Sequence, residues 1–453
     1  MPERAKLTFC SGTGVVTGAN FLLEIAGLKI LIDCGMIQGN KMAEDANWEP
    51  FTYDPATINA LIVTHGHVDH IGRIPKLVHD GFRGTIYSTH PTKEISEIML
   101  QDTAFILSHD REHDLKKIYN NQIISQALGS WKTFDYHETF SLGEGLKVEF
   151  SDAGHILGSA TVKIEYRGKT IVFTGDLGNS PSPLLRDTEM VQADYLVTES
   201  VYGDRNHDDK DTRRQKLVEI IQDAVKQKGA LVIPIFSLER SQELLFEIND
   251  LIENNRIPLV PFFLDSPLAI KLTAVFKKYS RYFNERAQKM INSGNDVFMF
   301  PGLRVTLETE ESKMIVRMPN PKIIIAGSGM STGGRIIHHE HNHLPDPKSI
   351  ILLIGYQSMG TLGRKLQEGV KRVRVAGEEV SVRARVAAID GYSGHKDSDG
   401  LLDFIQNMSD RVRKIFVVMG EPRSSLFLAQ KLRDYLGLDA RAPIAGESVE
   451  LEF

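Results

Sequence analysis

The sequence predicts an α/β protein in which one domain is interrupted by a second. In the first 203 residues, short β-rich runs such as 169–174 alternate with turns that carry Gly, Asp or His. From residue 204, helical stretches alternate with apolar strands such as 230–235, a pattern typical of a largely parallel sheet. After residue 378, strands with polar residues at their ends return. We therefore expect segments 1–203 and 379–453 to form one domain around an inserted domain, 204–378.

Length and composition are those of a globular protein with more than one domain. The 453 residues exceed one ordinary hydrophobic core, and 42% of them are hydrophobic and 25% charged. No apolar run approaches the roughly 20 residues of a membrane span, and the start of the chain lacks the pattern of a signal peptide. The two cysteines, Cys10 and Cys34, argue against a disulfide framework and a thiolate zinc site. We expect a cytoplasmic protein whose metal ligands are histidine and carboxylate.

The strongest candidate for chemistry is the run HGHVDH at residues 65–70, which follows an apolar strand. It places His65, His67, Asp69 and His70 in one short loop. Four such side chains behind a buried strand cannot all be satisfied cheaply by core packing, because buried polar groups cost free energy unless they are paired. The alternating spacing lets His65 and His67 address one position while the other two address a neighbouring one. The run therefore predicts a metal site, with two ions plausible.

Other polar residues follow strands elsewhere in the same domain. His155 lies among small residues, and by itself a satisfied core histidine is the simpler interpretation. Asp176 follows a buried strand, where an uncompensated carboxylate is costly and a carboxylate could bridge two cations. Asp33 admits three interpretations: a metal ligand, a partner that orients a histidine, or a turn residue.

These motifs, in this order, resemble the metallo-β-lactamase superfamily. The loop signature HxHxDH stands at residues 65–70, and the later ligand positions match His155 and Asp176. The interrupted layout narrows the resemblance to the RNA-processing branch of the β-CASP nucleases. Their inserted domain is similar to the stretches at 230–245, 262–271 and 325–339, and their later acidic and histidine motifs match Glu199 and His395. The resemblance implies an αββα sandwich interrupted by an α/β β-CASP domain.

The resemblance also implies the ligand set and the catalytic roles. One zinc ion would be held by His65, His67, His155 and Asp176, and a second by Asp69, His70 and the bridging Asp176. Imidazole and carboxylate suit zinc, and a catalytic site keeps a position open for water. His395 would protonate the departing oxygen, oriented by Glu199, and Asp69 would orient the attacking water.

One position departs from the family pattern. RNA-processing members carry a histidine after the final strand as a further ligand of the second zinc, whereas this chain has Met419. A neutral thioether is a poor zinc ligand, so we expect one tight zinc site and a weaker second one. The DNA-repair branch carries an apolar residue at this position, which keeps a DNA nuclease open as an alternative.

Three features outside the metal motifs admit both a functional and a structural interpretation. The small-residue loop at 327–335 could hold an RNA phosphate through Ser328, Ser331 and Arg335, or it could be a structural turn. The basic stretch at 363–375 could contact phosphate or form a solvated strand edge, in a chain whose net charge is −6. Four histidines at 338, 339, 341 and 343 cannot all face one way on a helix, and a partly solvated helix surface is the simpler interpretation.

The function predicted by the resemblance is a zinc-dependent ribonuclease acting on single-stranded RNA, by internal cleavage, from the 5′ end, or both. The alternatives are a DNA nuclease of the repair branch and a catalytically weak relative that binds nucleic acid. A small-molecule thioesterase is disfavoured, because it gives the inserted domain no role. A homodimer is suggested by the resemblance alone.

Overall fold

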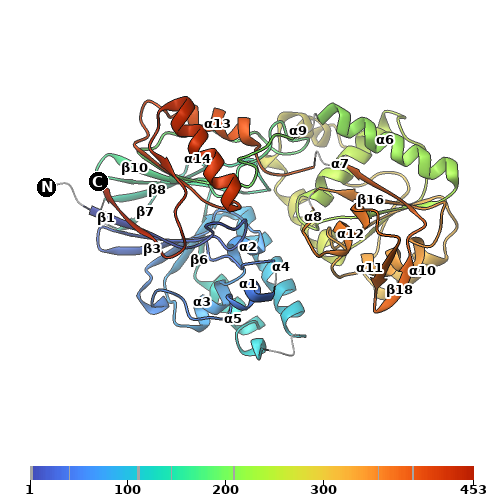
Figure 1. Ribbon diagram of the computed structural model, residues 1–453, viewed down its shortest axis with the longest axis horizontal. Coiled ribbons are helices and arrows are strands. Elements are labelled where there is room, and N and C mark those ends of the chain that lie inside the picture. The colour runs from blue at the N-terminus through green and yellow to red at the C-terminus, as the bar shows by residue number, and fades with distance from the viewer. Residues whose placement is uncertain are drawn as a thin grey trace. The chain divides into compact units, whose positions relative to one another are not determined.

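The structure is a computed structural model that describes residues 4–39, 41–109, 113–143, 145–207, 210–355, 357–389 and 392–453. The chain divides into two compact units, drawn in Figure 1. Unit 1 consists of Met1–Asn206 with Gly394–Phe453, and unit 2 consists of His207–Ser393. None of the described helices combines the length and the apolar character that a membrane-spanning segment needs.

Unit 1 contains two seven-stranded sheets. The first has the order β22-β1-β2-β3-β4-β5-β6, with β1 Arg4–Ser11, β2 Asn20–Ile25, β3 Leu28–Ile32, β4 Ala60–Ile62, β5 Thr85–Thr89, β6 Trp131–Phe134 and β22 Ser448–Glu452. The second has the order β21-β20-β11-β10-β9-β8-β7, with β7 Phe140–Gly143, β8 Leu146–Asp152, β9 Ala160–Tyr166, β10 Lys169–Phe173, β11 Tyr195–Thr198, β20 Lys414–Val417 and β21 Ala440–Arg441.

The two sheets pack face to face and helices cover their outer faces. Apolar residues at every second position of β1 point inward, and Phe9 meets Phe416 of the other sheet with 5.3 Å between ring centroids. Separate apolar clusters join each outer face to its helices, which lie on opposite sides of unit 1 in Figure 1. The helices are α1 Lys41–Asp45, α2 Val68–Ile71, α3 Ile74–His79, α4 His90–Leu107, α5 Asn121–Gly129, α13 Ser398–Gln406 and α14 Pro422–Leu436, with 3₁₀ turns η1 Pro55–Thr57 and η2 Leu115–Lys117. This is an αββα sandwich.

Parallel strands in each sheet of unit 1 place the polar loops. β3, β4 and β5 are parallel to one another, as are β10, β11 and β20. Because the carboxyl ends of parallel strands meet at one edge of a sheet, the loops that follow β3 and β4 lie together, as do those that follow β10 and β11. Asp33 and the 65–70 run come from the first pair of loops, and Asp176 and Glu199 from the second.

Unit 2 is built on a parallel six-stranded sheet with the order β14-β13-β15-β12-β16-β19. Its strands are β12 Ala230–Pro234, β13 Phe262–Asp265, β14 Leu303–Val305, β15 Lys322–Ala326, β16 Ile350–Ile354 and β19 Arg385–Ile389, and β17 Arg372–Val375 pairs with β18 Glu378–Ser381 as a separate hairpin. The helices are α6 Lys210–Gln227, α7 Arg240–Glu253, α8 Pro267–Lys278, α9 Glu285–Asn292, α10 Thr309–Arg317, α11 Ile336–His343 and α12 Leu362–Gln367, with the 3₁₀ turn η3 Ser280–Tyr282. β19 lies after residue 378, the predicted end of the inserted domain.

Helix α7 differs from the amphipathic helix that its sequence predicts. Residues 241–252 are all buried, including five acidic or amide side chains that periodicity places on a solvent face. Arg213 of α6 pairs with Glu247, and Asp250 accepts hydrogen bonds from Arg214 and Arg286. These pairs let α7 bury its polar face, because a buried charge is tolerated when it is paired and hydrogen-bonded.

Candidate metal centre

Four side chains of unit 1 bring one ligand atom each to a common point. Nε2 of His65 lies 3.0 Å from Nδ1 of His67 and 3.4 Å from Oδ2 of Asp176. Nε2 of His155 lies 3.3 Å from the same nitrogen of His67 and 3.6 Å from the same oxygen of Asp176. Four ligands at zinc's usual distance of about 2.0–2.1 Å in a tetrahedron would be about 3.3 Å apart. The four atoms are therefore spaced as the ligands of one small cation.

A second group shares the carboxylate of Asp176. Nε2 of His70 lies 3.4 Å from Oδ1 of Asp176 and 3.9 Å from Oδ2 of Asp69. The ligand atoms of Asp69, His70 and Asp176 all lie within 4.8 Å of one another. The two oxygens of Asp176 thus face different groups, which is the arrangement of a carboxylate that bridges two ions.

Two atoms of this second group are buried without a partner. Nε2 of His70 and Oδ1 of Asp176 have no hydrogen bond within the described part of the chain, although both side chains are nearly inaccessible to solvent. A buried polar atom without a partner costs roughly 1–3 kcal/mol. A cation between the two groups would satisfy both atoms, and so the residues present fit a metal.

Asp33 fixes the orientation of His70 through a hydrogen bond to the ring nitrogen that faces away from Asp176. Its Oδ2 lies 2.7 Å from Nδ1 of His70 and accepts a 2.8 Å hydrogen bond from Thr64 Oγ1, while its Oδ1 accepts from the Thr64 amide at 2.8 Å. Because Nδ1 of His70 is held by Asp33, Nε2 is left facing Asp176. Of the three interpretations open at the sequence level, the structure supports the partner that orients a histidine.

Two further groups contact the rings of candidate ligands, and neither group is among the residues predicted from the sequence. Oγ1 of Thr64 lies 3.1 Å from Nδ1 of His65, and the backbone carbonyl of Gly394 lies 3.0 Å from Nδ1 of His155. A carbonyl carries no side-chain signal, so no motif could have revealed Gly394. Thr64 directly precedes the histidine run, and that adjacency was the one available clue.

His395 and Glu199 form a pair at the margin of the metal centre. Nδ1 of His395 lies 3.2 Å from both carboxylate oxygens of Glu199 and 4.0 Å from Oδ2 of Asp176. The amides of Leu177 and Val201 donate hydrogen bonds to the Glu199 carboxylate, at 2.6 and 3.3 Å. The predicted acid and its predicted partner are thus within hydrogen-bonding reach of one another.

Burial and charge divide the histidines into two kinds. Burial lowers the pKa of His65 and His155 well below the usual range of imidazole, so both are neutral and can donate a lone pair to a metal. Burial alone would also lower the pKa values of His70 and His395. The carboxylates beside them reverse that effect, so the pKa of His70 lies well above its usual range and that of His395 rises to about 9. Burial raises the pKa of Asp69 to about 6.

Met419 packs into the apolar core between the two sheets. Its side chain is 2% exposed and belongs to the same cluster as Phe9 and Phe21. Its sulfur would lie 2.9 Å from a Cβ at Gly12, whose φ of +77° also favours glycine. The thioether at the position where the RNA-processing branch carries a histidine is therefore part of the hydrophobic core.

The predicted RNA-contact loop follows β15 in unit 2, and its side chains make hydrogen bonds within that unit. Arg335 donates to Asp265 at 2.7 Å and to the carbonyls of Thr306 and Leu307. The buried Ser331 hydroxyl donates to Glu340, and Ser328 is hydrogen-bonded to Thr332. A role for Ser328, Ser331 and Arg335 in RNA contact stays a prediction.

The histidine-rich stretch forms helix α11 and its histidines point in different directions, as the sequence predicts. His339 and His343, one turn apart, are buried, and Nε2 of His339 lies 2.7 Å from Oδ2 of Asp265. His338 is exposed, and His341 pairs with Glu378 at 2.9 Å. These partners are carboxylates within unit 2, and they account for two of the four rings.

Three domain models match the chain in succession. A metallo-β-lactamase superfamily domain matches residues 22–202, a Beta-Casp domain matches 241–366, and a Zn-dependent metallo-hydrolase RNA specificity domain matches 379–443. Ribonuclease TTHA0252 from Thermus thermophilus is 37% identical over 92% of this chain and 93% of its own length. The chain belongs to the β-CASP nuclease family of the metallo-β-lactamase superfamily. The family and the fold class predicted from the sequence are both confirmed.

Other relatives and one solved structure extend the comparison. An RNase J-like protein from Methanocaldococcus jannaschii is 33% identical over 92% of this chain and 93% of its own length. The transcription termination factor FttA from Methanosarcina mazei is 30% identical over 98% of this chain and 71% of its own length. The crystal structure of a protein of unknown function from Enterococcus faecalis V583 covers 99% of this β-CASP chain with a TM-score of 0.60 and 12% identity, a likeness in fold. With its family and its His/Asp cluster, this chain is a metal-dependent hydrolase, as predicted.

Proposed function

We propose that this β-CASP protein is a zinc-dependent ribonuclease that hydrolyses phosphodiester bonds of single-stranded RNA. The observation that carries the proposal is the convergence of His65, His67, His155 and Asp176 at the spacing of a tetrahedral cation site, beside a second group that shares Asp176. Imidazole with carboxylate suits zinc better than Mg²⁺ or Ca²⁺, which prefer oxygen ligands. The names of the relatives, a ribonuclease and an RNase J-like protein, support RNA as the substrate.

Different residues of this chain have different roles in the proposed hydrolysis. Zinc, when bound, supplies Lewis-acid chemistry: it makes water a nucleophile near neutral pH and offsets charge on the phosphodiester. Asp33 and the Gly394 carbonyl hold His70 and His155 in the orientations that ligation needs. Asp69, whose carboxylate lies beside His70, accepts a hydrogen bond from the attacking water and so orients it.

His395 is the proton donor in this proposal. Its Nδ1 is held by Glu199, so Nε2 carries the proton that passes to the departing oxygen of the RNA. The Glu199 carboxylate favours the protonated ring and raises the pKa of His395 to about 9. Glu199 acts through His395 and is a positioning residue.

We also propose that the two metal positions differ in affinity. The first has four protein ligands, whereas the second has Asp69, His70 and the shared Asp176, with Met419 in the core. A thioether adds little affinity for zinc. Elemental analysis after extensive dialysis should therefore find about one zinc per chain, and two tightly held ions would contradict this part of the proposal.

A cleavage time course tests the function. End-labelled single-stranded RNA and a DNA of matching sequence are incubated with zinc and either the parent or an Asp69→Ala, His70→Ala double variant. We expect RNA to be cut by the parent and spared by the variant, and the product ladder to distinguish internal cleavage from cleavage at the 5′ end. Cleavage of neither polymer by the zinc-loaded parent would overturn the proposal in favour of a silent RNA-binding relative.

A DNA nuclease is the second candidate, and Met419 is the observation that favours it. An apolar residue at this position resembles the DNA-repair branch. The RNA specificity domain that matches residues 379–443 favours the first candidate. Preferential cleavage of the DNA strand in the same experiment would select the second.

We also propose that the protein is cytoplasmic and forms a homodimer. Both cysteines, Cys10 and Cys34, are free, and burial raises the pKa of each thiol, to about 11 and about 12. Unreactive free thiols fit a reducing cytoplasm. A homodimer rests on the family resemblance, and sedimentation equilibrium of the full chain tests it.

A further inference from the structure

A basic surface of unit 2 is formed by the end of α12, the β17–β18 hairpin and the residues that lead into β19. We call residues 364–385 the basic hairpin. This segment contains seven Lys or Arg and three Glu residues, a net charge of +4, in a chain whose net charge is −6. Along β17 the burial alternates, so that Val373 and Val375 pack into the core while Arg372 and Arg374 face outward.

Four cations of the basic hairpin have no carboxylate partner among the described residues, and one of them, Arg374, donates a hydrogen bond to the Gly377 carbonyl instead. Arg364 pairs with Glu368, Arg372 with Glu379 and Arg385 with Asp223. Lys365, Lys371 and Arg383 are exposed and make no such pair within the part of the chain that the structure describes.

The backbone places these three cations in succession. The amide of Val370 donates to the Lys365 carbonyl at 3.2 Å, and the amide of Val382 donates to the Lys371 carbonyl at 2.8 Å. These hydrogen bonds bring Lys365 near Val370, the residue before Lys371, and Lys371 near Val382, the residue before Arg383. We call Lys365, Lys371 and Arg383 the cation stripe.

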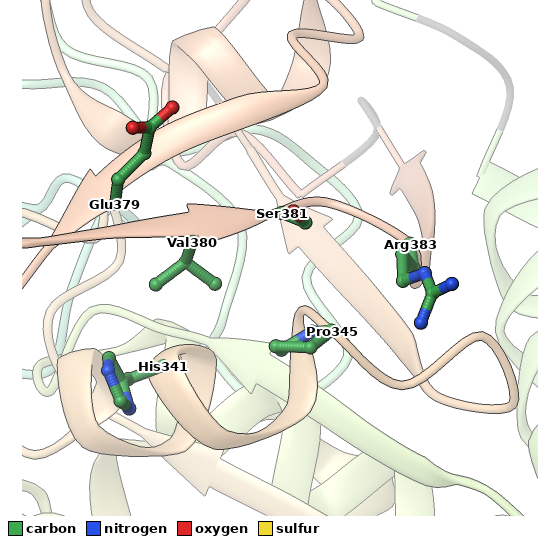
Figure 2. A pocket seen from close by; sticks show the side chains of 6 residues that line it. All are labelled: His341, Pro345, Glu379, Val380, Ser381 and Arg383. Carbon is green, nitrogen blue, oxygen red and sulfur yellow. The ribbon is translucent and has the colours of Figure 1, made fainter.

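A pocket of about 420 Å³ opens beside this stripe, between α11 and the free edge of β18. It is lined by His341, Pro345, Glu379, Val380, Ser381 and Arg383 (Figure 2). Val380 points toward α11, whereas the Glu379 carboxylate points to the other side of the strand (Figure 2), where it lies 3.4 Å from Arg372. The volume is in the range of about 300–1,000 Å³ that holds small organic ligands, and so one nucleotide fits.

The basic hairpin lies at the opposite edge of the unit 2 sheet from the predicted RNA-contact loop. Arg383 comes two residues before β19 begins, at the amino edge of the sheet. The loop at 327–335 follows the carboxyl end of β15. Because all six strands are parallel, the two features are separated by at least the length of a strand.

We propose that the basic hairpin binds the sugar–phosphate backbone of single-stranded RNA, with one nucleotide seated in the adjoining pocket. The inference rests on the proposed ribonuclease function. Flexible, exposed cations along a strand suit a repeating phosphate chain. An acidic protein is the less favoured occupant, because protein interfaces need an apolar centre, and the exposed faces of β17 and β18 carry none.

The test compares RNA binding by charge variants of the full chain. The background is the Asp69→Ala, His70→Ala variant, so that the RNA stays uncut. One variant carries Lys365→Gln, Lys371→Gln and Arg383→Gln. The matched control carries Lys277→Gln, Lys278→Gln and Lys289→Gln, which remove the same charge from α8 and α9, beside the other end of the sheet. Circular dichroism melting shows that both are folded.

Fluorescence anisotropy with a long labelled oligouridylate, over a range of KCl concentrations, gives the expected result. The hairpin variant should bind roughly tenfold more weakly at low salt, and the slope of log Kd against log salt should fall by about 0.7 for each phosphate that the variant no longer neutralises. The control should match the background protein.

Three outcomes would overturn the inference. An unchanged salt slope in the hairpin variant, with RNA still cleaved by the parent, would overturn this inference alone. A parent that neither binds nor cleaves RNA would overturn the proposed function and the inference with it. Loss of binding to a labelled oligoglutamate with RNA binding intact would assign the surface to an acidic protein instead.

Discussion

Each unit buries a cluster of histidine and carboxylate side chains, and the two clusters are satisfied in different ways. In unit 2, both oxygens of the fully buried Asp265 are taken. Thr306 and Arg335 donate to Oδ1 at 2.6 and 2.7 Å, and Ser312 and His339 hydrogen-bond to Oδ2. In unit 1, Asp176 is equally buried, but its nearest histidine nitrogens are 3.4–3.6 Å away and its Oδ1 has no partner within the described residues.

This difference separates a structural cluster from an incomplete one. The donors around Asp265 outweigh its burial and hold the pKa of its carboxyl far below the usual range. This network satisfies both oxygens of Asp265 without any added ion, although Nδ1 of His339 has no hydrogen-bond partner among the described residues. The group around Asp176 instead places three histidine nitrogens and one carboxylate oxygen at the mutual spacing of a cation site, and leaves Oδ1 of Asp176 and Nε2 of His70 without a hydrogen-bond partner among the described residues. Residue types alone do not distinguish the two clusters, whereas the hydrogen bonds to the central carboxylate do.

Replacing Asp176 is expected to have the largest effect. Asp176→Asn removes a charged ligand atom that the two groups share, so zinc should be lost. The activation barrier for RNA cleavage should rise by several kcal/mol, which lowers the rate on the order of a thousandfold. Zinc content and single-turnover cleavage measure the two effects. Because the zinc-free carboxylate still pairs with His70, the zinc-free melting temperature should fall, but by less than in Asp265→Ala. An equal or larger fall would mean that Asp176 is structural, as Asp265 is.

Replacing His395 tests whether chemistry and metal binding are separable in unit 1. His395→Ala should lower the cleavage rate roughly 10²–10⁴-fold and leave the zinc content at the parent's value, because His395 acts as the acid. Glu199→Gln should lower the cleavage rate by a smaller factor, because Glu199 acts by orienting the His395 ring. Cleavage at the full rate would remove the acid from the mechanism, and loss of zinc would make His395 a ligand.

Asp265→Ala should lower stability and leave zinc binding unchanged, whereas Asp176→Asn should mainly reduce zinc binding. Removing one member of a buried ionic network costs about 3–5 kcal/mol, so the free energy of unfolding should fall by that amount while the zinc content per folded chain stays the same. Urea titration measures the change. Asp223→Ala, which removes the exposed partner of Arg385, is the control and should cost about 0–1 kcal/mol. An equal loss of unfolding free energy in both variants would show that the Asp265 cluster stabilises the fold no more than an exposed ion pair does.

The smallest predicted effect concerns pH and Glu340, beside the Asp265 cluster. Burial raises the pKa of Glu340 from 4.5 to about 7, so between these two pH values the folded chain holds a proton that the unfolded chain has released. Stability should therefore fall with rising pH across that window, by about 3 kcal/mol, and level off above it. Denaturant titrations at several pH values should show this fall in the parent and not in Glu340→Gln. Parallel pH profiles would contradict the prediction.

Local sequence patterns reveal the parts of the site that lie close together in the chain. His65, His67, Asp69 and His70 stand within six residues behind a strand, so their grouping follows from the strand and its turn. The grouping of His155 and Asp176 with them depends on sheet pairing, and it was available through the family resemblance alone. The structure brings these atoms together, and their binding of zinc stays a prediction.

Other features could not be predicted, for physical reasons. The Gly394 carbonyl is backbone and appears in no motif. The role of Asp33 depends on which atom meets it, His70 Nδ1 in the event. The layered fold follows from strand and helix periodicity together with the resemblance, but periodicity treats every polar residue as exposed. Helix α7 and the Asp265 cluster bury theirs by pairing them, and pairing between distant segments leaves no periodic trace.

The return of the chain to unit 1 has a consequence for protein synthesis. Gly394 and His395 are translated after the whole inserted segment, and β20 and β22 follow them to pair with β11 and β1. A ribosome makes the histidine loop at 65–70 long before the carbonyl that contacts His155 and the ring that we propose as the proton donor. A nascent chain that contains the loop therefore still lacks its proposed acid, and we expect it to have no nuclease activity until its synthesis is complete.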